Sequence, residues 1–317
     1  MCLTALVGTV QAGERKKPFR LGLIGLDTSH VTAFTGYINE GTRDHGCEVV
    51  AGYPGGSPDI PSSAERVDKF TEELREKHGL EIVESVEALV EKVDGVLLES
   101  VDGRPHLEQA RPVIAAGKPL FIDKPMAGSL KDVIAIFRLA READVPCWSS
   151  SSLRYSPGII GMRNDEEVGE VLGCEAFSPC HLEEHHPDFY WYGVHGVEIL
   201  FTIMGTGCKQ VQRAHCDGAD LAVGVWEGGR IGTFRGLRSG KQDYGALVYG
   251  SKGIKRSGSY AGYGPLCDEI VRFFQTGQAP VPPEETIELF AFMTAADVSK
   301  KRGGAPVTLE EVLEEAR

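Results

Sequence analysis

The sequence lacks an apolar run long enough to cross a bilayer, and it has little positive charge. Its 46 Asp and Glu residues outnumber its 33 Lys and Arg residues, which leaves a net charge of −13 over 317 residues. An acidic surface repels phosphate backbones and anionic headgroups. We therefore expect neither nucleic acid nor a membrane as a partner.

Paired cysteines are also lacking. The eight cysteines are scattered from Cys2 to Cys267, and none forms a Cys-x-x-Cys pair. This spacing argues against a zinc ribbon and a dense disulfide framework. It favours buried thiols that pack as small hydrophobic side chains.

The first eighteen residues lack the features of a folded element. The apolar run Leu3–Val10 leads into Val10-Gln11-Ala12, which resembles a signal-peptide cleavage site, but no basic segment precedes it. We interpret residues 1–18 as a tail or a residual signal sequence. The compartment stays open: cytoplasmic, or exported if residues 1–12 are the end of a signal peptide.

Residues 19–150 alternate between short apolar segments and amphipathic ones. Strands are expected at 19–25, 48–52, 81–83, 95–99, 119–123 and 145–150. Helices are expected to begin near Ser29, Ser62, Ser85, Pro105 and Ser129. Strand–helix–strand units joined by right-handed crossovers predict a doubly wound parallel sheet, the Rossmann fold of dinucleotide-binding domains.

The pattern changes after Ser152. Strands are expected in succession at 171–182, 208–217, 219–227, 230–238 and 244–251, and helices at 190–204, 265–276, 284–300 and 308–316. This order predicts an α+β domain over residues 151–317 with an open, mainly antiparallel sheet. The chain is thus predicted to be a two-domain α/β protein, and its open sheet face favours a homo-oligomer.

The turn after the first strand departs from the dinucleotide fingerprint Gly-x-Gly-x-x-Gly. Gly25 fills the first position, but Asp27 and His30 replace the second and third glycines. Asp27 would add bulk and negative charge beside the phosphates, whereas Thr28, Ser29 and the helix N-terminus can donate hydrogen bonds to an anion. The candidate cofactor contacts of this turn are Gly25, Asp27, Thr28, Ser29 and His30.

The second strand lacks the acidic residue that would bind the ribose hydroxyls. Residues 51–57 read AGYPGGS, and the first acidic residue after them is Asp59. Three interpretations stay open. A dinucleotide is held differently, its adenosine end is held loosely, or the Rossmann scaffold has lost its cofactor.

Lys124 is the strongest candidate for chemistry. It follows the apolar segment 119–123 at the carboxyl edge of the predicted sheet, where open α/β proteins bind their ligands. Asp123 before it and the rigid Pro125 after it restrict its direction. Partial desolvation would suit its ammonium group to proton transfer.

Four motifs resemble the glucose–fructose oxidoreductase / inositol dehydrogenase / rhizopine-catabolism family. They are Asp123-Lys124-Pro125, Pro105-His106, Arg154-Tyr155-Ser156-Pro157 and Gly193-Val194-His195-Gly196-Val197-Glu198. The resemblance covers about residues 19–317, and it implies oxidation of a hydroxyl on a sugar or cyclitol with NAD or NADP. The family's lysine and histidine, here Lys124 and His195, would bind the reacting hydroxyl and move its proton.

The sequence departs from the family at two places near His195. Glu198 replaces an aspartate, and Trp191 stands where the family often has an acidic residue. Tyr192 is then the nearest alternative hydroxyl for catalysis. The resemblance further implies cofactor contacts from Ser100, His106, Asp123, Lys124 and Pro125, and substrate contacts from Arg154, Tyr155, His185, His186 and Glu198.

Spacing adds two expectations. His195 and Glu198 are three residues apart on one helix face, so the carboxylate could orient the imidazole. The histidines of segment 180–188, His181, His185 and His186, could bind zinc, but a loop without a further ligand pair favours substrate contacts and no metal.

Two other classes of function stay open beside the dehydrogenase. One is a lyase or hydrolase that holds NAD tightly for a transient oxidation. The other is a non-catalytic binding protein built on a Rossmann scaffold. A dehydrogenase should change the nicotinamide absorbance with a polyol, a lyase or hydrolase should purify with its cofactor, and a scaffold should bind none.

Overall fold

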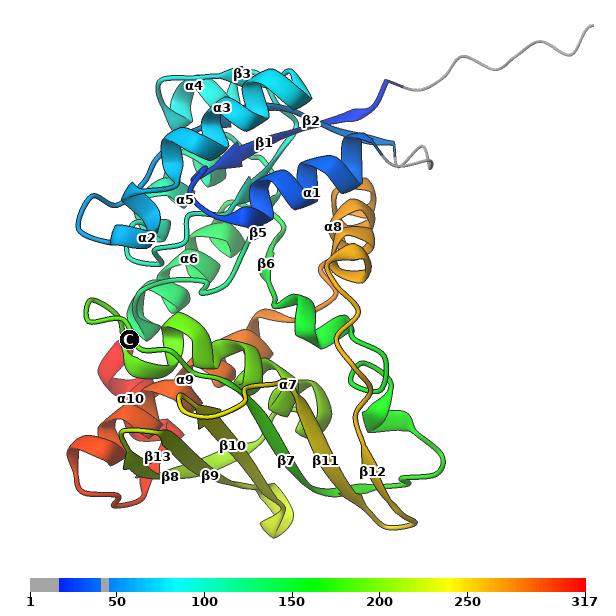
Figure 1. Cartoon of the computed structure of the whole chain (residues 1–317), viewed down its shortest axis with the longest axis vertical. Coiled ribbons are helices and arrows are strands. Elements are labelled where there is room, and N and C mark those ends of the chain that lie inside the picture. The colour runs from blue at the N-terminus through cyan, green and yellow to red at the C-terminus, as the bar shows by residue number, and fades with distance from the viewer. Residues whose placement is uncertain (1–16, 41–45) are drawn as a thin grey trace, which may run out of the picture.

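The computed structural model describes residues 17–40 and 46–317. Residues 1–16, almost the whole of the expected tail or signal remnant, lie outside these ranges. The described chain builds two sheets, one toward each end of the molecule (Figure 1). Within these ranges no helix combines the length and the apolar character that a bilayer span requires.

The first sheet has six parallel strands in the order β3-β2-β1-β4-β5-β6. The strands are β1 (Phe19–Ile24), β2 (Cys47–Tyr53), β3 (Glu81–Ile82), β4 (Gly95–Leu98), β5 (Leu120–Ile122) and β6 (Cys147–Ser149). Every residue of β4 and β5 is buried because both faces of the sheet are covered. The predicted doubly wound Rossmann sheet is confirmed.

The helices between these strands begin where capping residues indicated. They are α1 (Ser29–Asn39), α2 (Pro61–Ala64), α3 (Val67–His78), α4 (Val86–Val90), α5 (His106–Ala115) and α6 (Leu130–Glu142). The side chains of Thr28, Ser85 and Ser129 each accept a backbone N–H of the following turn. One expectation is wrong: the single helix near Ser62 is the short α2 followed by a separate α3.

The second sheet has seven strands in the order β12-β11-β7-β10-β9-β8-β13. They are β7 (Val171–Pro179), β8 (Cys208–Cys216), β9 (Ala219–Trp226), β10 (Ile231–Leu237), β11 (Gly245–Gly250), β12 (Ile254–Arg256) and β13 (Val307–Thr308). Only β7 and β10 pair in parallel among these neighbours. The prediction of a mainly antiparallel sheet is confirmed.

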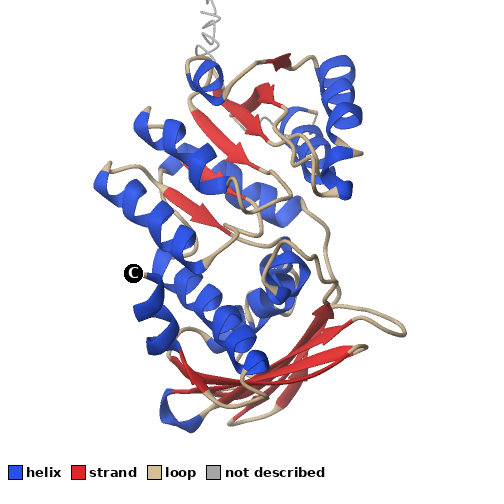
Figure 2. Ribbon diagram, turned by 90° about the vertical axis from the view of Figure 1, so that its left-hand side faces the viewer, coloured by secondary structure: helices blue, strands red, loops and turns tan. Residues whose placement is uncertain are grey.

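One face of the second sheet is covered by helices and the other is open (Figure 2). The covering helices are α7 (Val194–Met204), α9 (Pro283–Lys301) and α10 (Leu309–Ala316). Short helical turns elsewhere in this half of the chain are Ser152–Tyr155, Met162–Asn164, Phe189–Gly193 and Glu227–Gly229. Gly196 lets α7 approach the sheet, since a Cβ there would lie 2.2 Å from the ring of Phe234. The self-association expected for the open face stays a prediction.

Helix α8 (Gly264–Thr276) returns from the second half of the chain to the first sheet. It lies beside α1 (Figure 1), and its side chains Leu266, Ile270 and Phe273 are buried with Leu21 and Phe34 in one apolar cluster. This return brings the segment before α8 to the start of α1. The division of the chain near residue 150 stays a prediction.

Candidate active site

A cavity of about 460 Å³ lies between the carboxyl edge of the parallel sheet and α7. Both halves of the chain line it. The lining residues are Thr28, Ser29, His30, Ser62, Arg66, Val101, Lys124, Ser152, Leu153, His181, Trp191, Tyr192, His195, Tyr244, Tyr260 and Tyr263. None of these described lining residues is acidic, although the chain carries a net charge of −13, so the cavity favours hydroxyl-rich or anionic ligands.

Lys124 and His195, expected to act together, line this one cavity. Lys124 follows β5 and His195 is the second residue of α7. The Nδ1 atom of His195 lies 2.7 Å from the hydroxyl of Ser151. Burial and the charge of Lys124 hold the pKa of His195 well below its ordinary value. The imidazole is therefore neutral at neutral pH.

Glu198 does not orient His195. Its Oε1 atom accepts hydrogen bonds from Ser150 at 2.8 Å and from Nε of Arg154 at 2.6 Å. Arg154 also pairs with Glu285 at 2.7 Å, and all three ionic side chains are buried. A buried guanidinium needs such partners, because an unpaired charge in the interior is costly.

The expected substrate contacts at Arg154, Tyr155 and Glu198 are accordingly absent from the described cavity lining. Tyr155 is buried in the apolar cluster that α8 shares with the first sheet. These residues support α7 and the chain entering it. Ser151, which the sequence did not indicate, is the residue that contacts the imidazole of His195.

The first turn differs from the expectation for Asp27. Gly25 adopts φ +84°, and a Cβ there would lie 2.2 Å from the hydroxyl of Ser100, so only glycine fits. Asp27 is fully buried and accepts hydrogen bonds from the N–H of Val101 at 2.9 Å and from Ser63 at 2.5 Å. The carboxyl group of Asp27 therefore points into the protein and not toward the cavity.

The segment 54–63 crosses the carboxyl edge of the first sheet. Its Pro54 carbonyl accepts the N–H of Leu26 at 2.7 Å. Its Ser57 donates to Asp102, in the loop after β4, at 2.6 Å. Strands β1 and β4 flank the point where the strand order reverses, and Rossmann folds hold dinucleotides in that crevice. Segment 54–63 therefore lies across this crevice.

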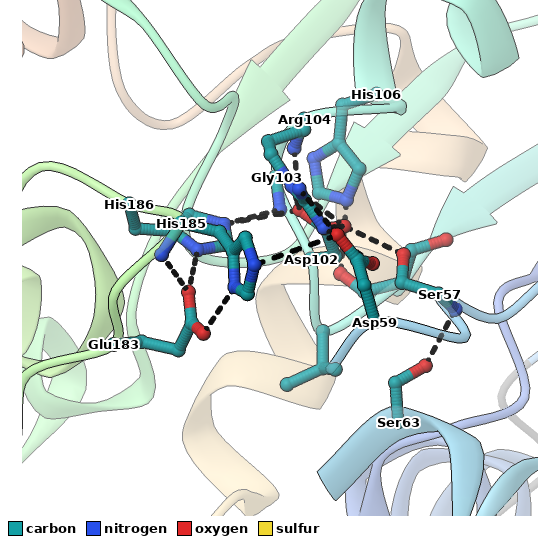
Figure 3. Close-up of polar contacts among 12 residues, drawn as sticks. Ser57, Asp59, Ser63, Asp102, Gly103, Arg104, His106, Glu183, His185 and His186 are labelled. Carbon is teal, nitrogen blue, oxygen red and sulfur yellow. Dashed lines mark hydrogen bonds and ion pairs between the residues drawn. The ribbon is translucent and has the colours of Figure 1, made fainter. Parts of the chain in front are cut away.

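Asp102 is the centre of the hydrogen-bond network that holds segment 54–63 at the sheet edge (Figure 3). It accepts from Ser57 and from Arg104, whose guanidinium also pairs with Asp59 at 2.8 Å. Burial alone would raise its pKa, but hydrogen bonds from His186, Arg104 and Ser57 bring the pKa of this carboxyl well below its ordinary value. Asp102 is thus ionised and bound on several sides.

His185 and His186 extend the same network and do not line the cavity (Figure 3). The Nδ1 atoms of both lie 2.8 Å from the carboxylate of Glu183. The Nε2 atom of His186 lies 3.1 Å from Asp102 and 3.2 Å from the backbone nitrogen of Gly103. They join the two halves of the chain rather than facing a substrate. Among the described ranges, no three His, Cys, Asp or Glu side chains are grouped to hold a metal ion.

His106 and Ser100 support the loops around the cavity. The ring nitrogens of His106 lie 3.1 Å from the carbonyl of Met126 and 2.9 Å from that of Ser100. The hydroxyl of Ser100 donates to Gln109 at 2.9 Å. Neither these residues nor Pro125 line the cavity within the described chain, so direct cofactor contact by them stays a prediction.

His30, the third-glycine substitute, lies against Asp123. Its Nδ1 atom is 2.6 Å from Oδ2 of Asp123, and both side chains are almost fully buried. His30 lines the cavity together with Thr28, Ser29 and Lys124. The sequence predicted that these residues lie near a cofactor, but it did not predict the contact between His30 and Asp123.

Three further tyrosines of the lining were missed. Tyr244, Tyr260 and Tyr263 come from the segments before β11 and α8, and the hydroxyl of Tyr244 lies 3.1 Å from that of Tyr192. Two of them lie in the glycine-rich stretch SGSYAGYG of residues 257–264. This composition could have predicted a loop that contributes to a binding site.

The cavity fits the phosphate and nicotinamide parts of a dinucleotide. Hydroxyls of Thr28 and Ser29 stand at the N-terminus of α1, and the guanidinium of Arg66 has no hydrogen-bond or ion-pair partner in the described part of the chain. Lys124 and His195 stand with them in the lining. Arg66 would add a positive charge for the phosphates of the cofactor.

Comparisons with known proteins bear on the family and on the fold. Residues 20–151 match the oxidoreductase family with an NAD-binding Rossmann fold. A 1,5-anhydro-D-fructose reductase of Ensifer adhaerens is 31% identical over 172 residues, which are 52% of this chain and 47% of the reductase. The matched region thus spans about half the length of that curated relative.

Solved structures share the fold of the whole chain. A scyllo-inositol dehydrogenase from Lactobacillus casei, solved with NAD(H) and scyllo-inositol, has a TM-score of 0.74 at 13% identity and covers 93% of this chain and 100% of its own. A myo-inositol 2-dehydrogenase from Lactobacillus plantarum has a TM-score of 0.74 at 15% identity, with coverages of 92% and 99%. Within residues 20–151 the chain is thus similar to the glucose–fructose oxidoreductase / inositol dehydrogenase / rhizopine-catabolism family of oxidoreductases.

Proposed function

We propose that the protein is an NAD(P)-dependent oxidoreductase that acts on a hydroxyl of a sugar or cyclitol. The observation that carries the proposal is the meeting of Lys124 and His195 in one cavity beside the N-terminus of α1. Its relatives include a sugar reductase and inositol dehydrogenases, which supports this substrate class.

The lining suits a polyol. Trp191 and the tyrosines present apolar ring faces together with hydroxyl groups, as pockets for polar small molecules do. Lys124 would donate a hydrogen bond to the reacting oxygen and stabilise the negative charge that develops there. Neutral His195, held at Nδ1 by Ser151, would hold the same oxygen through Nε2.

The cofactor would be held by Thr28, Ser29 and the α1 N-terminus at its phosphates. When bound, its oxidised nicotinamide supplies the hydride acceptor. Tyr192, bonded to Tyr244, would contact a neighbouring substrate hydroxyl. Residues of both halves of the chain line the cavity around the reacting atoms.

The test is a change in nicotinamide absorbance when the purified protein receives NAD⁺ or NADP⁺ and a panel of sugars, sugar acids and cyclitols. Binding of NADH and NADPH is measured in parallel by fluorescence. Turnover with at least one polyol, lost in Lys124→Ala, is the expected result. Failure to bind either reduced cofactor would overturn the proposal.

A further inference from the structure

His30 stands in the cavity with one ring nitrogen engaged and the other available. Its Nδ1 atom lies 2.6 Å from Oδ2 of Asp123, and its Nε2 atom has no hydrogen-bond partner among residues 17–40 and 46–317. The ring lies against Phe34, with centroids 5.2 Å apart, and against Tyr263 at 4.7 Å. These contacts fix the ring plane, so the imidazole is held in one orientation toward the cavity.

The carboxylate of Asp123 supplies a negative charge behind this ring. Burial alone would raise its pKa, but the charge and hydrogen bond of His30 and the charge of Lys124 bring the pKa of Asp123 below its ordinary value. A carboxylate bonded to Nδ1 stabilises the imidazolium that forms when Nε2 takes up a proton, as in Asp–His pairs of hydrolases.

Glu99 leaves this charge undisturbed. It follows β4, is fully buried, and neither carboxyl oxygen has a hydrogen-bond partner in the described chain. Burial and the charge of Asp123 raise its pKa well above the ordinary value, which favours the neutral carboxyl. Asp123, and not Glu99, is therefore the carboxyl group that contacts His30.

The cavity lining holds two further histidines, His181 and His195, and His195 is a poor proton acceptor. His195 is buried beside the positive charge of Lys124, and both effects oppose a second positive charge on its ring. Oxidation of a hydroxyl nevertheless releases a proton, which needs an acceptor at the cavity. His30 is the cavity histidine that has a carboxylate behind it.

We propose that His30, oriented by Asp123, is the group that accepts the proton of the reacting hydroxyl. The substrate O–H bond breaks and its proton bonds to Nε2 of His30. The electron pair of that bond forms the second C–O bond, while the C–H pair leaves as hydride to the oxidised nicotinamide of NAD(P)⁺. Asp123 is a positioning residue. This step rests on the proposed function.

Charged and titratable groups come from every element packed around His30. They are Asp123 and Lys124 after β5, Glu99 after β4, His195 on α7, and Tyr260 and Tyr263 before α8. Any variant used as a test must leave these neighbours in place.

The first experiment needs no cofactor. In the full chain labelled with ¹⁵N-histidine, nine histidines contribute signals, and the one missing from His30→Gln assigns His30. We expect the neutral ring to carry its proton on Nδ1, and we expect Asp123→Asn to require more acid for protonation of His30. A neutral ring protonated on Nε2, or a titration unchanged by Asp123→Asn, would overturn the pairing.

The second experiment separates this step from the proposed function. His30→Gln should bind NADH as wild type does but lose about 10²–10⁴-fold in turnover, with recovery on adding free imidazole. His215→Gln, on β8 outside the cavity, is the matched control and should keep wild-type turnover.

The outcomes differ for the two proposals. Turnover of His30→Gln at the wild-type rate would overturn the proton step alone. A wild-type protein that binds neither NADH nor NADPH and oxidises no polyol would overturn the proposed function, and the proton step with it.

Discussion

Ser63 donates a hydrogen bond of 2.5 Å to the buried carboxylate of Asp27, and this contact joins α2 to the turn that follows β1. The hydroxyl of Ser63 also accepts the N–H of Ser57 at 2.8 Å. The aspartate that replaces a fingerprint glycine is therefore the anchor of the segment that closes the crevice. Its acidic group is used within the protein, which explains how a Rossmann turn tolerates a carboxylate at this position.

Ser63→Ala should destabilise the fold. It removes a hydrogen bond to a buried acidic group and leaves Ser57 N–H without this acceptor, for which we expect a loss of about 1–3 kcal/mol in the free energy of unfolding. Denaturant unfolding measures it. Ser62→Ala is the matched control, because the buried Ser62 hydroxyl has no partner in the described chain. Equal stability of the two variants would contradict the role of Ser63.

Arg154 should matter for folding and not for substrate binding. Arg154→Ala leaves the buried carboxylates of Glu198 and Glu285 unpaired, and we expect a loss of about 3–5 kcal/mol in the free energy of unfolding. The milder Glu198→Gln keeps a hydrogen-bonding oxygen for Arg154 and should stay folded, with KM for the identified polyol unchanged. A large rise in KM for Glu198→Gln would contradict this prediction and support the substrate contact that the family resemblance implied.

The sequence predicted the elements that local patterns encode. Apolar runs located the strands of the first sheet, and capping residues such as Ser129 located helix starts. Position at the carboxyl edge of a strand also placed Lys124 in the cavity that His195 lines. These features depend on neighbouring residues or on general rules of sheet topology, so they can be read without a structure.

The remaining parts of the site depend on distant contacts. Ser63 meets Asp27 across 36 residues, and Ser57 meets Asp102 across 45. No local pattern encodes such a closure. Tyr263 reaches the cavity because α8 returns to the first sheet, and an amphipathic helix does not indicate which sheet it covers.

Lys124→Ala should abolish turnover without unfolding the protein. The ammonium group lies in the cavity and has no ion-pair partner within the described ranges, so its loss breaks no structural contact of that kind. Loss of a group that stabilises charge or transfers a proton costs about 10²–10⁴-fold in rate. Steady-state kinetics measures the loss of turnover, and a thermal unfolding curve shows whether the variant is still folded. Lys131→Ala, exposed on α6, is the control and should behave as wild type.

Asp102 should make the stability of the protein depend on pH. Its pKa in the folded protein lies well below the ordinary value of about 3.9 that applies in the unfolded chain. A carboxyl with a lowered folded pKa stabilises the fold at neutral pH, and this contribution is lost as pH falls below about 4.

Asp102→Asn should therefore be less stable than wild type at pH 7, by about 3–5 kcal/mol because a buried ion partner is lost, and the difference should shrink in acid. Urea unfolding at a series of pH values measures it. Asp59→Asn, the exposed partner of Arg104, should cause little change. A difference between wild type and Asp102→Asn that stayed constant from pH 7 into acid would show that the carboxylate's charge does not hold the network across the sheet edge.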